Sequence, residues 1–123
     1  MFYEQDWILR QISIIIKFIR SLLSKEGNVY EQDEEQTVFK EEIEKLIELN
    51  RLKEANSLIV KTSKDKDVLA LGLWFYDLLN DLSDKRLEEG ALAREDILKG
   101  LRTLLYNSDR VDNSIVDIII DKY

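Results

Sequence analysis

The sequence predicts an all-α protein of six or seven helices, built as an array of helix hairpins behind a long N-terminal amphipathic helix. The chain has no proline and only four glycines in 123 residues, so few positions interrupt a helix. Apolar residues recur along most of the chain at the spacing of a helix face. A chain of this length forms one ordinary domain, which we expect to span residues 1–123.

The first predicted helix, residues 4–25, carries more apolar surface than one core requires. Eleven of the seventeen residues in its segment WILRQISIIIKFIRSLL (7–23) are large and apolar. On a helix they cover about 220°, against the 100° or somewhat more of an ordinary surface helix. One stripe suits the core: Ile8, Ile12, Ile15, Ile16, Ile19, Leu22 and Leu23. A second stripe beside it, Trp7, Ile14 and Phe18, needs a cover of its own: the last two helices, a second copy, another protein or a lipid surface.

The next two helices are predicted as a pair. Residues 27–28 (Gly-Asn) end the first helix, and Asp33 can cap the second through its carboxylate. Apolar residues then follow at helical spacing, at Phe39, Ile43, Leu46 and Ile47. Residues 50–51 (Asn-Arg) interrupt the pattern, and a third helix is expected over 52–62.

The second half of the chain predicts four more helices. Residues 64–67 (KDKD) form a charged turn before a helix over 68–82, which is apolar on two sides, as a central helix should be. Ser83 suits the N-cap of a short helix over 84–89, and Gly90 suits its end. A sixth helix is expected over 93–106.

Two positions in this half carry a specific expectation. Gly100 inside the sixth helix costs about 1 kcal/mol relative to alanine, so it predicts a close helix crossing. Residues 115–120 are rich in isoleucine and suit a strand as well as a helix. We favour a helix, capped by Asp112 or Asn113, because no partner strand is visible elsewhere.

A weak repeat supports the hairpin array. Residues 49–55 (LNRLKEA) resemble the turn and second-helix start of a tetratricopeptide repeat, and residues 87–90 (LEEG) follow at nearly its 34-residue period. This pattern pairs the second helix with the third and the fourth with the fifth. The chain lacks the Trp-x-x-Leu-Gly start and the closing proline of that repeat.

Composition excludes several functions. Histidine and cysteine are both absent, which removes imidazole bases, thiolate nucleophiles, disulfides and zinc sites built from those residues. The net charge is −7 and the basic residues form no cluster, which disfavours nucleic-acid binding. Residues 1–30 carry a net charge of +1, whereas residues 31–50 carry −6. The glycines form no phosphate-binding loop.

Acidic side chains are the only candidates for catalysis or metal binding. Glu41, Glu44 and Glu48 share one helix face, and Asp77 and Asp81 share another. Di-metal sites in helical bundles normally use a Glu-x-x-His motif, which this chain cannot supply. We therefore expect solvent-exposed acids, no metal, no cofactor and no enzymatic activity.

The N-terminus, MFYEQD, is acidic where a signal peptide would be basic. Arg10, Lys17 and Arg20 argue against a membrane-spanning first helix, because each costs about 2.5–3.5 kcal/mol at the bilayer centre. The lack of cysteine suits a reducing compartment, so we expect a cytoplasmic protein.

The functional expectation is an interaction or scaffold protein that forms a homodimer. Its contact would be the stripe of Trp7, Ile14 and Phe18 on the first helix, since tryptophan is enriched at interfaces. One alternative is a peptide-binding module that uses Asn50 and Asn80 in a groove between the second and fourth helices. Another is attachment of the first helix to a membrane surface, with Lys17 and Arg20 toward the headgroups.

Five short stretches resemble one family of short bacterial proteins known only as a domain of unknown function. They are residues 4–12 (EQDWILRQI), 75–84 (FYDLLNDLSD) with 87–90 (LEEG), and 94–97 (REDI) with Gly100-Leu101. One departure is Ala93, where the family pattern leads us to expect a Ser or Thr cap, so the sixth helix should start less firmly. The resemblance implies an all-helical cytoplasmic protein and transfers no catalytic residue.

Overall fold

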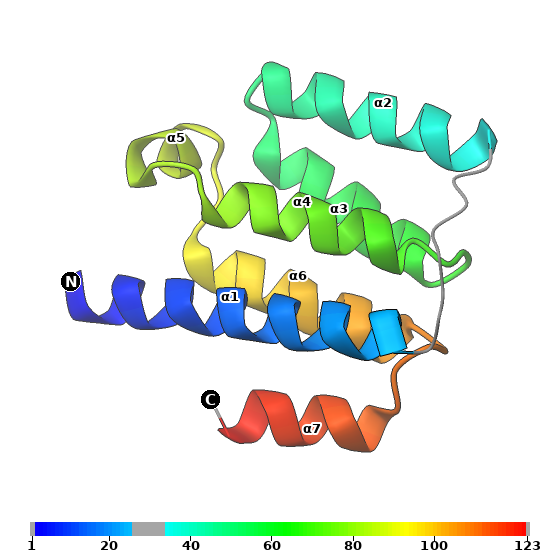
Figure 1. Cartoon of the computed structure of the whole chain (residues 1–123). Helices are drawn as coiled ribbons and strands as arrows, with labels where there is room; N and C mark the ends of the chain where they lie inside the picture. Colours follow the sequence, from blue (N-terminus) through cyan, green and yellow to red (C-terminus); the bar gives the residue numbers. More distant parts are fainter. Residues whose placement is uncertain (1, 26–33, 123) are drawn as a thin grey trace.

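The structure, a computed structural model, confirms the all-α class. It describes residues 2–25 and 34–122, and this part of the chain contains seven helices and no strand. In chain order the helices are α1 (Phe2–Lys25), α2 (Glu34–Glu48), α3 (Leu52–Ser63), α4 (Leu69–Asn80), α5 (Asp84–Glu89), α6 (Arg94–Asn107) and α7 (Asn113–Lys122) (Figure 1). The expected ends at residues 27–28 and at Asp33 lie outside the described residues.

Helix α6, rather than α4, lies at the centre of the packing. It contacts α1, α3, α4 and α7, whereas α4 packs mainly against α1 and α6. As expected, α4 is buried on more than one side, with Phe75, Tyr76 and Leu79 fully enclosed. The sequence of α4 is more continuously apolar than that of α6, so the sequence predicts that α4 is buried. How many helices each one contacts depends on the tertiary packing and cannot be predicted in this way.

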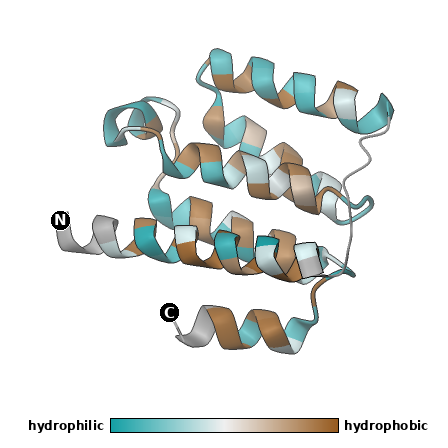
Figure 2. Ribbon diagram, in the orientation of Figure 1, coloured by the Kyte–Doolittle hydropathy of each residue, from teal (hydrophilic) through white to brown (hydrophobic). Residues whose placement is uncertain are grey.

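The core stripe of α1 is buried as expected. Ile12, Ile15, Ile16 and Ile19 expose 1% or less of their surface, and they lie on the side of α1 that packs against α4 and α6. Brown, apolar positions of α1, α4 and α6 occur between teal, polar ones, while α2 is largely teal (Figure 2). The first helix therefore closes one side of the bundle, and α2 forms a more polar edge (Figure 1).

Helices α2 and α3 pack against each other as an antiparallel pair. Asn50 joins them in the left-handed region, at φ 57°, which asparagine tolerates better than most residues. The second expected pair is different: α5 has only six residues, and α4 turns back through it to pack on α6. A short α5 cannot cover the apolar length of α4, so α6 takes that place.

The caps agree only in part with the sequence. The Ser83 hydroxyl accepts from the Arg86 N–H, as predicted. Gly90 ends α5 with φ −84°, and the left-handed residue is instead Ala91, at φ 60°. Gly90 is needed for space, because a Cβ there would lie 2.6 Å from Leu52 Cδ1 on α3.

The start of α6 is firmer than the missing Ser or Thr at position 93 predicts. The Asp96 carboxylate accepts a hydrogen bond from the Ala93 N–H at 2.9 Å and so supplies one half of a capping box. Residues 115–120 are helical, as favoured. The Asp112 carboxylate caps α7 by accepting from the Ser114 N–H and hydroxyl, and these bonds lower the pKa of Asp112.

Gly100 marks the predicted close crossing. A Cβ at Gly100 would lie 2.3 Å from the Tyr76 hydroxyl and 2.6 Å from Asn56 Oδ1. These two groups hydrogen bond to each other at 2.7 Å and join α3 to α4 directly over α6. Burial raises the pKa of Tyr76 well above its usual range, so the phenol stays a neutral donor.

This crossing gives a double-mutant test. Gly100→Ala should lower the free energy of unfolding by about 1–3 kcal/mol, because overpacking outweighs the better helix propensity of alanine. In a Tyr76→Phe background the same substitution should cost less, since the nearest of the clashing atoms is gone while Asn56 Oδ1 remains. Urea unfolding of the four proteins measures both values. Additive effects of the two substitutions would show that the alanine methyl at position 100 does not contact the Tyr76 hydroxyl.

Candidate interaction surface

The second stripe of α1 remains uncovered by the described chain. Trp7, Ile14 and Phe18 are 55%, 45% and 44% exposed, whereas the core stripe on the same helix is buried. Successive members are seven and four residues apart, so they lie in one row about 16 Å long. Neither α6 nor α7 takes up this row, although both were candidates to cover it.

Basic side chains border the row on one side. Arg10 and Lys17 are exposed, and their helical positions lie next to those of Ile14 and Phe18. Further round the helix, Arg20 pairs with Asp77 of α4 at 3.1 Å and is thereby tied to the body of the protein. The uncovered face of α1 is therefore apolar along its middle and positively charged along one border.

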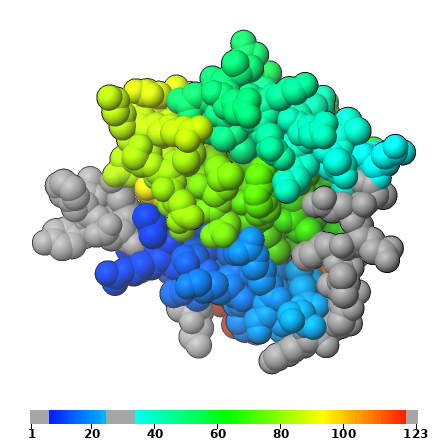
Figure 3. All heavy atoms as spheres, turned by 45° about the horizontal axis from the view of Figure 1, so that its top comes forward, coloured from blue at the N-terminus to red at the C-terminus, as the bar shows by residue number. Residues whose placement is uncertain are grey.

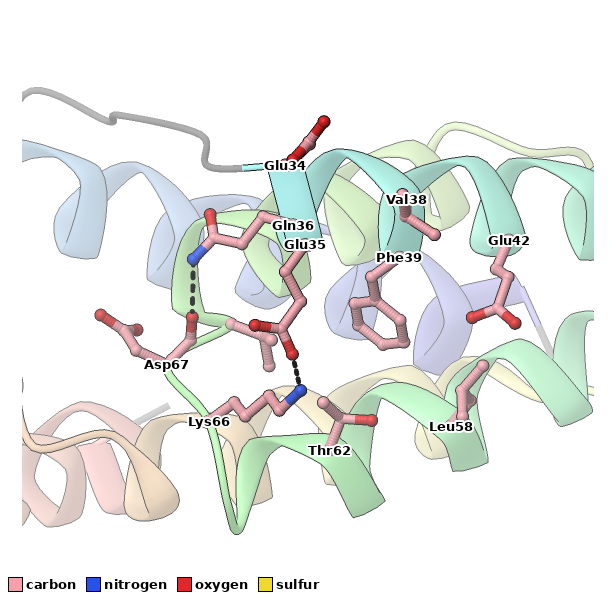
Figure 4. Close-up of a pocket in the computed structure, with 11 residues that line it drawn as sticks. Glu34, Glu35, Gln36, Val38, Phe39, Glu42, Leu58, Thr62, Lys66 and Asp67 are labelled. Carbon is pink, nitrogen blue, oxygen red and sulfur yellow. Dashed lines mark hydrogen bonds and ion pairs between the residues drawn. The ribbon is translucent and has the colours of Figure 1, made fainter.

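A second uncovered surface is a groove between α2 and α3. It has a volume of about 830 Å³ and runs to the turn that enters α4. Phe39 points from α2 toward α3, where Leu58 and Thr62 lie below it, and Val38 is close by (Figure 4). Phe39 and Leu58 are half-buried and Val38 is 58% exposed, so the groove presents apolar side chains to solvent.

The rim of the groove is acidic. Glu35 forms an ion pair with Lys66, and the Asp67 backbone oxygen accepts from Gln36 Nε2 at 3.2 Å (Figure 4). These contacts hold the start of α2 against the α3–α4 turn. Glu34 and Glu42 also line the groove, are exposed, and form no ion pair with another described residue.

Asn80, a predicted peptide-binding residue, is 4% exposed, and its side chain hydrogen bonds inside the protein. Its Nδ2 donates to the Leu9 oxygen of α1 at 3.0 Å, and its Oδ1 accepts from Arg94 Nη1 at 3.4 Å. The Arg94 guanidinium is 7% exposed and also donates to the Asn80 and Leu82 backbone oxygens and to Asp84. All five guanidinium N–H groups thus have an acceptor.

Asn50, the second predicted peptide-binding residue, lies in the α2–α3 turn. Its Nδ2 donates to the Arg86 oxygen at 3.3 Å, and Arg86 Nη2 donates to the Ile47 oxygen at 3.2 Å. Asn50 Oδ1 is a buried atom without a hydrogen-bond partner. The structure does not bring Asn50 and Asn80 together: one ties α5 to the α2–α3 turn, and the other ties α1 to α4 and α6.

Trp74, the other tryptophan, is half-buried against the core, and the Lys40 ammonium of α2 lies 4.9 Å from the centre of its ring. This cation–π contact links α2 to α4. The carboxylates considered for metal binding are dispersed: Glu41, Glu44, Glu48 and Asp81 are exposed, and Asp77 pairs with Arg20. No group of three acidic side chains able to hold a metal ion occurs among the residues that the structure describes.

In the part of the chain that the structure describes, these observations define an all-α fold with two uncovered apolar surfaces, one basic at its border and one acidic at its rim. The chain belongs to DUF6483, a family of unknown function whose profile matches residues 2–108. No curated protein matches the sequence, and no solved structure matches the fold. In its described part, the chain has no helix with the length and apolarity that membrane crossing requires.

The Asn80 bonds predict that this residue stabilises the fold. Asn80→Ala should lower the free energy of unfolding by about 1–3 kcal/mol, because Arg94 and the Leu9 oxygen each lose a buried partner. The exposed Asn113→Ala is a matched control and should change stability by less than about 0.5 kcal/mol. Thermal and urea unfolding provide the measurement. Equal effects of the two substitutions would remove Asn80 from the stabilising network.

Proposed function

We propose that the protein is a non-enzymatic interaction or scaffold protein that self-associates through α1. The observation that carries this proposal is the row of Trp7, Ile14 and Phe18, each about half exposed on a helix whose other face is fully buried. Large apolar side chains grouped in this way are typical of interaction sites. A homodimer is the simplest assembly, since two-fold dimers are the commonest closed oligomers.

The lack of histidine and cysteine supports a non-enzymatic role, because the commonest catalytic bases and nucleophiles are missing from the sequence. The same lack of cysteine supports a cytoplasmic location. Tetratricopeptide-like stacking has support only from the α2–α3 pair and the residue 49–55 resemblance.

The alternatives have weaker support. Peptide binding would need the side-chain amides of Asn50 and Asn80, but both amides already donate hydrogen bonds to backbone oxygens of this chain. Membrane-surface attachment through α1 would use Lys17 and Arg20, but Arg20 is already paired with Asp77, and the protein carries a net charge of −7. Anionic headgroups would therefore repel most of the molecule.

Phe18→Asp tests the self-association. The substitution places a carboxylate in the apolar row, so the variant should be monomeric where the wild-type protein is dimeric. Light scattering over a concentration series gives the mass, and circular dichroism shows whether the variant is folded. Leu49→Asp, at a residue 67% exposed in the α2–α3 turn, adds the same charge outside the row and should stay dimeric. A folded Phe18→Asp variant with unchanged mass would contradict the proposal.

A further inference from the structure

We infer that the α1 row of one copy binds in the α2–α3 groove of a second copy, rather than against that copy's α1. This inference rests on the proposed self-association and identifies the surface that receives α1. It would make Val38, Phe39 and Leu58 part of the interface together with Trp7, Ile14 and Phe18.

The groove offers apolar side chains to the apolar row of α1. Ile14 and Phe18 are four residues apart on α1 and project about 6 Å from each other along its axis. The groove is open to solvent, and Phe39 of α2 and Leu58 of α3 form its apolar wall (Figure 4). An amphipathic helix that inserts its apolar face into an apolar groove is a recurrent mode of recognition.

The charges match as well. Arg10 and Lys17 border the α1 row, and Glu34 and Glu42 line the groove without an ion pair among the described residues. An antiparallel two-fold pair of α1 helices would instead place the basic borders of both copies along the same edge. Like charges on one edge repel, whereas the groove supplies opposite charge.

One copy cannot satisfy both surfaces internally. Helix α4 lies between α1 and α2 on the face seen in Figure 3. The Arg20–Asp77 ion pair holds α1 to α4, and the Lys40–Trp74 contact holds α2 to α4. The α1 row also points away from the core, so the helix that reaches the groove must come from another copy.

The test compares one variant of each surface by analytical ultracentrifugation of the full chain. Phe18→Asp changes one residue of the inserted α1 row, and Val38→Asp changes one residue of the groove. Both variants should fold, because the two side chains are 44% and 58% exposed. Each should weaken self-association at least about tenfold, as expected for the loss of an interface anchor. Leu49→Asp is the control for added charge and should associate as the wild-type protein does.

Mixing the two variants distinguishes the two modes of pairing. A Val38→Asp chain keeps its α1 row and a Phe18→Asp chain keeps its groove, so the mixture should recover a one-to-one complex that neither variant forms alone. A charge swap adds a second check: Lys17→Glu and Glu42→Lys should each weaken association, and their combination in one chain should restore it.

The outcomes separate the inference from the proposed function. If Phe18→Asp dissociates while Val38→Asp keeps the wild-type association constant, the groove inference is overturned and self-association through α1 stands. If the wild-type protein remains monomeric over the whole concentration range, both fail, and the two surfaces belong to a different partner.

Discussion

The arrangement of the helices depends on the hydrogen bonds that the buried Arg94 guanidinium donates. Arg94 begins α6, yet it is buried and donates to the end of α4 and to Asp84 of α5. Asn80 extends this network to the Leu9 oxygen of α1. One cation thus fixes the end of α4, the start of α6 and the position of α1 along the bundle. A buried charge of this kind is tolerated because each of its donors has an acceptor.

The crossing at Gly100 sets the second constraint. Helix α6 contacts four other helices, and the missing side chain at position 100 lets Tyr76 of α4 and Asn56 of α3 come directly over its backbone. With α1, α3, α4 and α7 all placed around α6, helix α2 is left at an edge, held by α3, by the Glu35–Lys66 ion pair and by the Lys40 contact with Trp74. The groove beside α2 follows from this edge position. The exposed row on α1 likewise follows from a helix with more apolar surface than its neighbours cover.

One of the two candidate surfaces, the α1 row, could be predicted from the sequence, but the α2–α3 groove could not. The periodicity of α1 identified Trp7, Ile14 and Phe18 as a stripe separate from the core, and they are exposed. The groove was missed, because Val38 lies off the apolar face of α2 and Leu58 reads as an ordinary core position of α3. The one available signal was Val38, an apolar residue off the apolar stripe of α2, beside Phe39 in an acidic segment. Asn50 and Asn80 were assigned to peptide binding because a polar residue near a helix end has the same appearance whether it binds a partner or the chain's own backbone.

The sequence by itself determined the all-α class, the helices from α1 to α7, the cap at Ser83 and the close approach at Gly100. These depend on local periodicity, on local hydrogen bonds and on the size of one residue. Only the tertiary structure decided that α6 is central, that α4 pairs with α6 rather than α5, and that the left-handed residue after α5 is Ala91. Those outcomes depend on which surfaces meet across long separations, as when Arg94 reaches Asn80 and Leu52 excludes a side chain at Gly90. Contacts of that kind leave no periodic signal in a single sequence.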